Sequence, residues 1–221
     1  MLRAVSHAAL PDWIAELVPP APRQALGDAL SGAGPPVRAA ALAPVARALA
    51  LAALARGIRR PLLVITPEDN DARRLAAELD PLLGVPAVFR LPPLDADPYR
   101  GMPAHPSIAA QRVTALDRLA GGDPVVVIAA VTALLVPVPR AATIRTWARD
   151  VRKGVRLDLD ALARELVGVG YRVVDVVGGP GDLARRGGLF DIWPPQEDSP
   201  LRVEMLGDEV ESVRRFDAGT Q

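Results

Sequence analysis

Three arginines in the last third of the chain have the residue type and the setting for anion recognition. Arg185 and Arg186 precede two glycines in the segment LARRGGLFDIWPP (183–195), and Arg172 lies in GYRVVDVV (170–177). A guanidinium donates paired hydrogen bonds to a carboxylate or a phosphate. Exposed arginines at a strand end are also common and often have no binding role. The residues alone leave open a phosphate site, a protein-docking surface and ordinary solvated side chains.

The sequence lacks a nucleotide site of the Walker A type. That motif needs a Gly-Lys-Ser/Thr run, in which the lysine ammonium reaches the terminal phosphates. The single lysine, Lys153, follows an arginine and precedes Gly-Val in VRKGVRL (151–157). The run SGAG (31–34) precedes no lysine and no Ser or Thr at a helix start, so it is typical of a loop. We therefore expect no nucleotide cofactor, no catalytic residue and no ATP hydrolysis by this chain.

The remaining polar residues form no recognisable catalytic or metal-binding pattern. His7 and His105 are far apart in the sequence and outside any zinc-ligand spacing. Asp95 and Asp97 lie among prolines, where turn-forming roles are common, so we disfavour a pair of catalytic carboxylates. The chain has no cysteine, which excludes thiolate catalysis and cysteine-ligated metal. We expect no metal and no other cofactor.

Composition limits the partners and the location of the protein. The 221 residues carry 26 basic and 26 acidic side chains, and aromatic residues make up 4%. Contacts to phosphates and stacked bases draw on positive charge and aromatic side chains, so a DNA-binding module is disfavoured, and a gel-shift experiment would test it. The apolar run ALAPVARALALAALA (41–55) contains proline and arginine. We expect no membrane span, no membrane partner and a cytoplasmic location.

The hydrophobic pattern predicts alternating strands and helices before residue 143. The wholly apolar run at 62–65 is typical of a strand buried on both faces. Thr66 stands where it could cap the next helix, and Pro44 where it could bend or start an earlier one. Strands are expected at 62–65, 85–92 and 125–135, and helices at 37–56, 67–83 and 107–122. This order favours an α/β layer with a mostly parallel sheet.

After residue 143 the pattern changes to one helix followed by antiparallel strands. The helix is expected over 158–171, with Asp158 or Asp160 near its N-terminus. Its inward face would comprise Leu159, Leu162, Leu166 and Val169. In LRVEML (201–206) apolar and charged residues alternate, and Gly207-Asp208 is a hairpin signal. We expect a small α+β domain with an antiparallel meander.

Two stretches of the sequence resemble a known family. RGGLFDIWPPQEDSPLRVEMLGDEVESVRRFDAGTQ (186–221) resembles the motif series of the UvrB-homology module, which the excision-repair helicase UvrB shares with transcription-repair coupling factors. LPPLDADPYRGMPAHPSIAAQRVTALDRL (91–119) resembles the corresponding stretch of the coupling factors. UvrB would instead carry a Walker A lysine near its start and a long aromatic hairpin that clamps DNA.

The resemblance implies a fold and a division of the chain. Residues 1–143 would form a degenerate, incomplete helicase-like α/β domain without a nucleotide site. Residues 144–221 would form the small α+β domain that docks on the repair protein UvrA. In the family the docking surface uses arginines and nearby apolar residues, and the matching positions here are Arg172, Arg186 and Phe190, with Arg185 beside them.

The resemblance also implies a function. We expect a non-catalytic recruitment module that docks UvrA, with DNA and RNA polymerase reached only through further domains of a longer parent protein, an ATP-dependent DNA translocase. The sequence would then be a truncated chain or a module of its own. The alternative is a UvrB-like helicase subunit of excision repair, which a nucleotide-binding titration would test.

Overall fold

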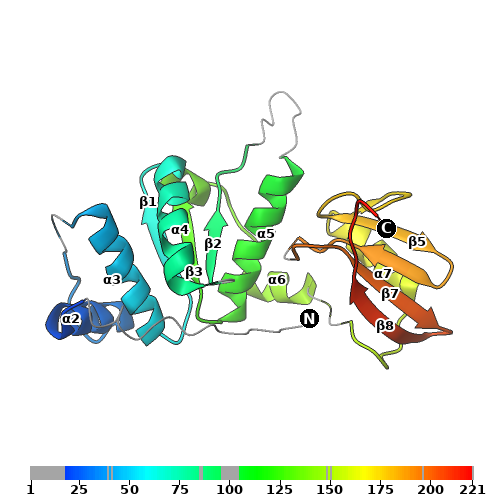
Figure 1. Ribbon diagram of the computed structural model, residues 1–221, viewed down its shortest axis with the longest axis horizontal. Helices are drawn as coiled ribbons and strands as arrows, with labels where there is room; N and C mark the ends of the chain where they lie inside the picture. The colour runs from blue at the N-terminus through cyan, green and yellow to red at the C-terminus, as the bar shows by residue number, and fades with distance from the viewer. Residues whose placement is uncertain are drawn as a thin grey trace. The chain divides into compact units, whose positions relative to one another are not determined.

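The computed structural model describes residues 18–38, 40, 42–84, 87–95, 105–147, 149, 151–195 and 197–220. They divide into two compact units (Figure 1). The first falls within residues 5–94 and 115–141, and the second takes in residues 95–114 and 142–221. The expected domain boundary between residues 143 and 144 stays a prediction.

The first unit is built on a parallel three-stranded sheet. Its strands are β1 (Leu62–Thr66), β2 (Val88–Leu91) and β3 (Val126–Ala130), in the order β1-β3-β2. All five residues of the central strand β3 are buried. Alternate residues of β3 pack toward α3 (Pro44–Gly57) and α4 (Asp69–Leu83) on one side and toward α5 (Pro106–Gly121) on the other. The predicted α/β layer with a parallel sheet is therefore confirmed.

Strand β1 departs from the prediction that it is buried on both faces. Leu62 and Val64 pack in the cluster with α3 and α4, but Leu63 and Ile65 are exposed. The reason is its position: β1 is an edge strand of the described sheet, and the apolar cluster around α5 covers β2 and β3 but contains no residue of β1. A wholly apolar run therefore did not distinguish an edge strand from a central one.

Helix α3 begins at Pro44, as the sequence allowed, but the predicted cap of the next helix was wrong. Helix α4 begins at Asp69, two residues later than expected. Thr66 is the last residue of β1, in register with Ala130, and its hydroxyl donates to the Glu68 carbonyl oxygen at 2.9 Å. Because the strand holds Thr66, its side chain cannot act as the helix cap.

Three short elements were not expected from the sequence. Helix α2 (Pro20–Ser31) begins at a proline and ends at Gly32, whose φ of 77° is left-handed. The SGAG run, expected to be a loop, therefore begins with the last residue of a helix. Strand β3 stops at Ala130 and continues as the 3₁₀ turn η1 (Val131–Leu134), and α6 (Ala141–Trp147) follows.

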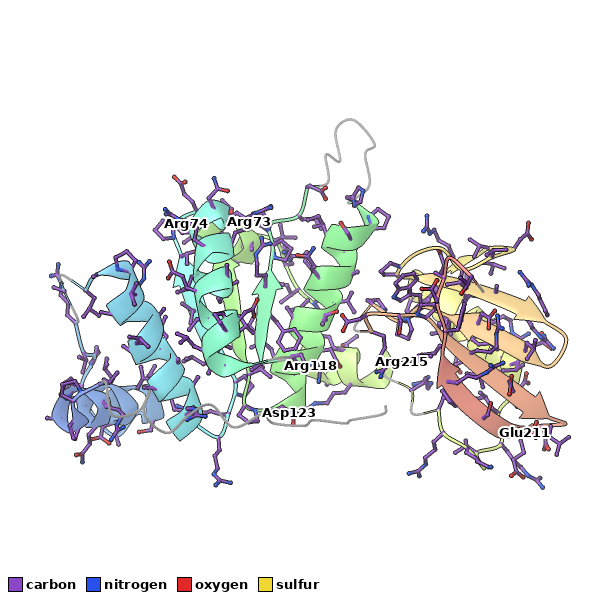
Figure 2. All side chains as sticks on the ribbon, in the orientation of Figure 1. Arg73, Arg74, Arg118, Asp123, Glu211 and Arg215 are labelled. Carbon is purple, nitrogen blue, oxygen red and sulfur yellow. The ribbon has the colours of Figure 1, made fainter. Side chains whose placement is uncertain are left out.

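Asp69 joins the start of α4 to the neighbouring strand β2. Its carboxylate accepts from Arg73, which projects from α4 (Figure 2), and from Arg90 on β2, at 2.8 and 2.7 Å. Partial burial raises the pKa of Asp69, but the hydrogen bonds from the two arginines outweigh it and hold the pKa below its usual value. Stability from a depressed carboxyl pKa is present above the unfolded-state pKa and is lost as the pH falls through the folded-state pKa.

We expect Asp69→Asn to lower the free energy of unfolding at pH 7 by about 1 kcal/mol or less, because the pairs are partly exposed. The difference in unfolding free energy between the variant and the wild type should shrink as the pH falls below 3.8, the ordinary pKa of an aspartate carboxyl. Urea titrations at a series of pH values would measure it. Asp71→Asn, which removes an exposed pair with Arg74, is the matched control. An equal deficit at pH 7 and pH 3 would contradict the electrostatic explanation.

The second unit contains α7 (Leu159–Gly168) and a mixed five-stranded sheet. The strands are β4 (Arg172–Val173), β5 (Asp182–Arg186), β6 (Leu189–Ile192), β7 (Leu201–Leu206) and β8 (Glu209–Arg215), paired in that order. Strand β4 runs parallel to β5, and the other neighbours are antiparallel. The expected meander is therefore confirmed, with one parallel strand added at its edge.

Helix α7 is positioned by a side-chain cap and an apolar face. The Asp158 carboxylate accepts from the backbone N–H groups of Asp160 and Ala161, at 2.9 and 3.0 Å, as a helix cap does. Leucines of the helix pack against alternate residues of the sheet, in a core of Leu159, Leu162, Leu166, Leu183, Phe190, Val203 and Val210. Val169 lies past the end of the helix and is exposed, so its predicted inward orientation was wrong.

Among the described residues, no helix is both long enough and apolar enough to cross a membrane.

Candidate functional site

Of the three arginines considered above, Arg172 lies on the edge strand β4 of the small sheet, and Arg185 and Arg186 lie on its neighbour β5. Successive side chains of a strand point to opposite faces. Leu183 of β5 packs in the core with α7, so Arg185, two residues on, lies on the α7 face. Asp182 and Arg186 lie on the opposite face, and so does Arg172, which is in register with Asp182 and pairs with it.

The Arg172 side chain is bound by a buried carboxylate but remains largely exposed. Its Nη2 donates to Asp182 Oδ1 at 2.7 Å, while Asp182 Oδ2 accepts from the backbone N–H groups of Gly178 and Gly179. The Asp182 side chain is only 7% exposed, whereas that of Arg172 is 60% exposed. The buried carboxylate thus orients Arg172 without covering it. The glycine-rich turn GGPGD (178–182) holds this carboxylate in place, because two of its backbone N–H groups donate hydrogen bonds to Asp182.

Arg186 is oriented by the backbone. Its Nη2 donates to the Asp175 carbonyl oxygen at 2.7 Å, which draws the side chain across toward the segment after β4. Arg186 is exposed and follows Asp182 by four residues, or about 13 Å along an extended strand. Arg172 and Arg186 therefore present two exposed guanidinium groups on the same face of β4 and β5.

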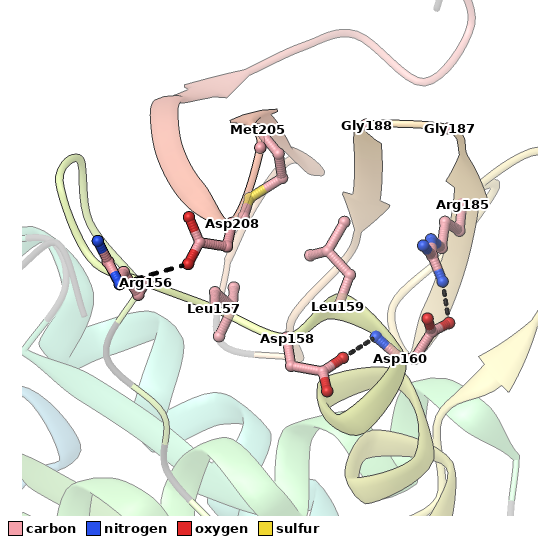
Figure 3. A pocket seen from close by; sticks show the side chains of 11 residues that line it. Arg156, Leu157, Asp158, Leu159, Asp160, Arg185, Gly187, Gly188, Met205 and Asp208 are labelled. Carbon is pink, nitrogen blue, oxygen red and sulfur yellow. Dashed lines mark hydrogen bonds and ion pairs between the residues drawn. The ribbon is translucent and has the colours of Figure 1, made fainter.

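Arg185 has a different setting, beside a pocket of about 680 Å³ (Figure 3). The pocket is lined by the segment 156–160, the turns at Gly187–Gly188 and Gly207–Asp208, and Met205. Arg185 points toward Asp160 and forms an ion pair with it, and on the other side Arg156 pairs with Asp208 at 3.7 Å. Both arginines of the pocket face carboxylates of the same chain, so the pocket offers no concentrated positive charge for a phosphate.

Phe190 does not lie on this surface, so its predicted role in contacting a partner is corrected. Its side chain is completely buried in the core between the sheet and α7, with Leu183 and Val203 among its neighbours. Strand alternation explains this, because Leu189 and Asp191 point to the other face. The sequence LFDI has apolar residues at 189, 190 and 192, so the pattern did not decide which of the first two faces inward.

Other residues considered from the sequence have ordinary structural roles where the structure describes them. The His105 ring nitrogen Nδ1 lies 2.8 Å from Ser107 Oγ at the start of α5, and Asp95 accepts from the His105 backbone. Within the described residues, no three His, Asp or Glu side chains gather where they could hold a metal ion. His7 and Asp97 lie outside the described residues. Lys153 is exposed in the turn before Gly154, which has a φ of 84°.

Sequence reasoning missed the buried carboxylates of the sheet. Asp191 binds Arg202 through two hydrogen bonds of 2.7 Å, and the Arg202 guanidinium lies 4.6 Å from the centre of the Phe216 ring. Asp182 fixes Arg172 in a comparable way. The local sequence around each aspartate looks like that of a solvated strand residue. The arginine that binds each one lies on a neighbouring strand, so the local sequence does not reveal the pair.

The small unit is similar to a known family of domains. Residues 150–221, which hold α7 and the five-stranded sheet, match the family model described as the UvrB interaction domain.

The longer matches are to transcription-repair-coupling factors, and the chain is homologous to a part of them. It is 36% identical to the Myxococcus xanthus protein over 197 residues, 31% to that of Bacillus subtilis over 162 and 32% to that of Escherichia coli over 161. These alignments cover 73–86% of this chain and 14–16% of the relatives. The chain thus spans a small fraction of the length of the proteins that it matches.

Proposed function

We propose that this chain is a non-catalytic recruitment module that docks the repair protein UvrA through the arginine-bearing edge of its small sheet. The observation that carries the proposal is the placement of two exposed arginines, Arg172 and Arg186, on one face of β4 and β5, inside the region that matches the UvrB interaction domain. Two oriented guanidinium groups suit carboxylates on a protein partner, because each can bind one carboxylate through paired hydrogen bonds.

Docking of UvrA would bring excision repair to the site where a longer coupling protein acts. In that arrangement, contacts to stalled RNA polymerase and translocation on DNA belong to other parts of the longer protein, and this chain supplies recruitment alone. The relatives named as transcription-repair-coupling factors support such a setting. No step of this function requires a nucleotide, a metal or a reacting side chain of this chain.

Reversing the charge of Arg186 is the direct test. We expect Arg186→Glu to weaken binding of purified UvrA at least about fivefold, because the new carboxylate would repel the carboxylates that the arginine attracts. Arg186 is a cleaner target than Arg172, whose removal would leave the buried Asp182 carboxylate without its cation.

Arg164→Glu is the matched control, because Arg164 is an exposed arginine of the same domain on α7. Surface plasmon resonance with UvrA would measure both variants, and circular dichroism would establish that they are folded. Equal affinities for wild type, Arg186→Glu and Arg164→Glu would exclude this edge as the docking surface.

A further inference from the structure

Strand β4 is an edge strand whose outer backbone groups point away from the sheet. The N–H of Arg172 donates to the Gly181 carbonyl oxygen at 2.8 Å, and the N–H of Val174 to that of Leu183 at 2.9 Å. In a strand, the N–H and C=O of the intervening residue point the other way. Val173 therefore directs its N–H and C=O outward, and among the described strands none pairs with β4 on that side.

The two faces of this edge differ in chemistry. On one face lie Arg172 and Arg186, as described above. Val173 points to the opposite face. Helix α7 covers that face away from the β4 edge, and the Val173 side chain is 66% exposed. Val167 and Val169, at the turn from α7 toward β4, are also exposed. The edge thus has cations on one face and uncovered valines on the other.

We propose that β4 is a pairing edge, on which an extended segment of UvrA adds a further strand, with acidic side chains on the arginine face and apolar side chains on the valine face. This inference rests on the proposed function and specifies how the partner binds. Strand addition of this kind takes its affinity from main-chain hydrogen bonds and its specificity from alternate side chains. An alternation of acidic and apolar residues is the pattern that meets both faces at once.

The charges disfavour a second copy of this chain as the occupant of the edge. A symmetric pairing of two β4 strands would bring Arg172 close to Arg172 of the other copy, and like charges across a strand pair are destabilising. The strand is also only two residues long, which gives a self-pairing little hydrogen bonding to offset that repulsion. An acidic partner segment gains attraction from the same arginines.

The first test places a charge on the valine face. We expect Val173→Asp to weaken binding of purified UvrA about tenfold or more, because it removes apolar contact and adds a negative charge beside the acidic segment. Leu206→Asp is the matched control: Leu206 is 72% exposed at the far end of β7 in the same sheet, and its variant should bind within about twofold of wild type.

The second test needs no variant and so does not depend on folding of a mutant. Amide hydrogen exchange of the full chain, alone and with UvrA, should show a slowing of exchange at the Val173 N–H on binding, because that group would enter a hydrogen bond. Unchanged exchange at Val173 in a saturated complex would overturn the strand pairing.

The variants separate failure of this inference from failure of the proposed function. If Arg186→Glu weakens binding while Val173→Asp binds like wild type, UvrA docks on the arginine face and β4 is not the pairing edge. If neither variant affects binding, UvrA docks elsewhere and both proposals fall. Self-association of the chain that Val173→Asp abolishes, without an effect on UvrA, would assign the edge to a second copy instead.

Discussion

Replacing Phe190 with alanine is expected to lower the free energy of unfolding of the small domain by about 3–5 kcal/mol. The ring is completely buried in the single apolar cluster described for this unit, where leucines of α7 meet the sheet. Removing it leaves a cavity that a five-stranded sheet clamped by one helix cannot close without shifting its strands. Urea titration followed at the amide resonances of β6 and β7 would measure the loss.

Phe190→Leu is the matched control for this prediction. Leucine keeps most of the volume, so we expect a cost below about 1.5 kcal/mol. UvrA binding should be unchanged for Phe190→Leu and should fall for Phe190→Ala only in proportion to the unfolded fraction. A folded Phe190→Ala variant that no longer binds UvrA would restore the role in partner contact that the buried position argues against.

The second large effect is expected at the Asp191–Arg202 pair. The Asp191 side chain is 5% exposed and that of Arg202 14% exposed, and two hydrogen bonds join them across β6 and β7. The hydrogen bonds that Arg202 donates to Asp191, together with the nearby acidic charges, outweigh partial desolvation and raise the pKa of Arg202 above its ordinary value, so the guanidinium stays charged. Asp191→Ala would leave the Arg202 guanidinium without its carboxylate partner. We expect this to lower the free energy of unfolding by roughly 2–4 kcal/mol, toward the low end for buried pairs because Arg202 keeps some exposure.

A double-mutant cycle isolates the pair from the packing around it. Arg202→Met keeps a long side chain against the Phe216 ring, and the variant with both Asp191→Ala and Arg202→Met should be more stable than Asp191→Ala alone. Thermal unfolding of the four proteins would provide the cycle. Additive losses would show that the two groups do not depend on each other.

Local sequence signals predicted the elements whose determinants lie within a few residues. Asp158 caps α7 because it stands directly before an apolar helical pattern, and Gly207-Asp208 turns the chain between β7 and β8. The alternation in LRVEML likewise placed Val203 in the core. In each case the neighbours in sequence are also the neighbours that decide the structure.

The candidate site could be predicted only in part, because its geometry depends on pairing between strands. The identity of Arg172 and Arg186 followed from the sequence, but their shared face follows from the parallel pairing of β4 with β5 and from Asp182. The exposure of Val173 depends on β4 being at the edge of the sheet. Phe190 was misplaced because two adjacent apolar residues satisfy the same pattern in either register.

The exposed turn at Lys153 has a practical consequence for chemistry on the protein. Because the chain contains one lysine and no cysteine, an amine-reactive dye has a single side-chain target, and an introduced cysteine would provide a second, independent one. The lysine lies near the start of the region that matches the UvrB interaction domain. A fluorescent donor dye at Lys153 and an acceptor dye on α4 of the other unit would therefore report the distance between the two units by energy transfer. The measurement could be made with and without UvrA.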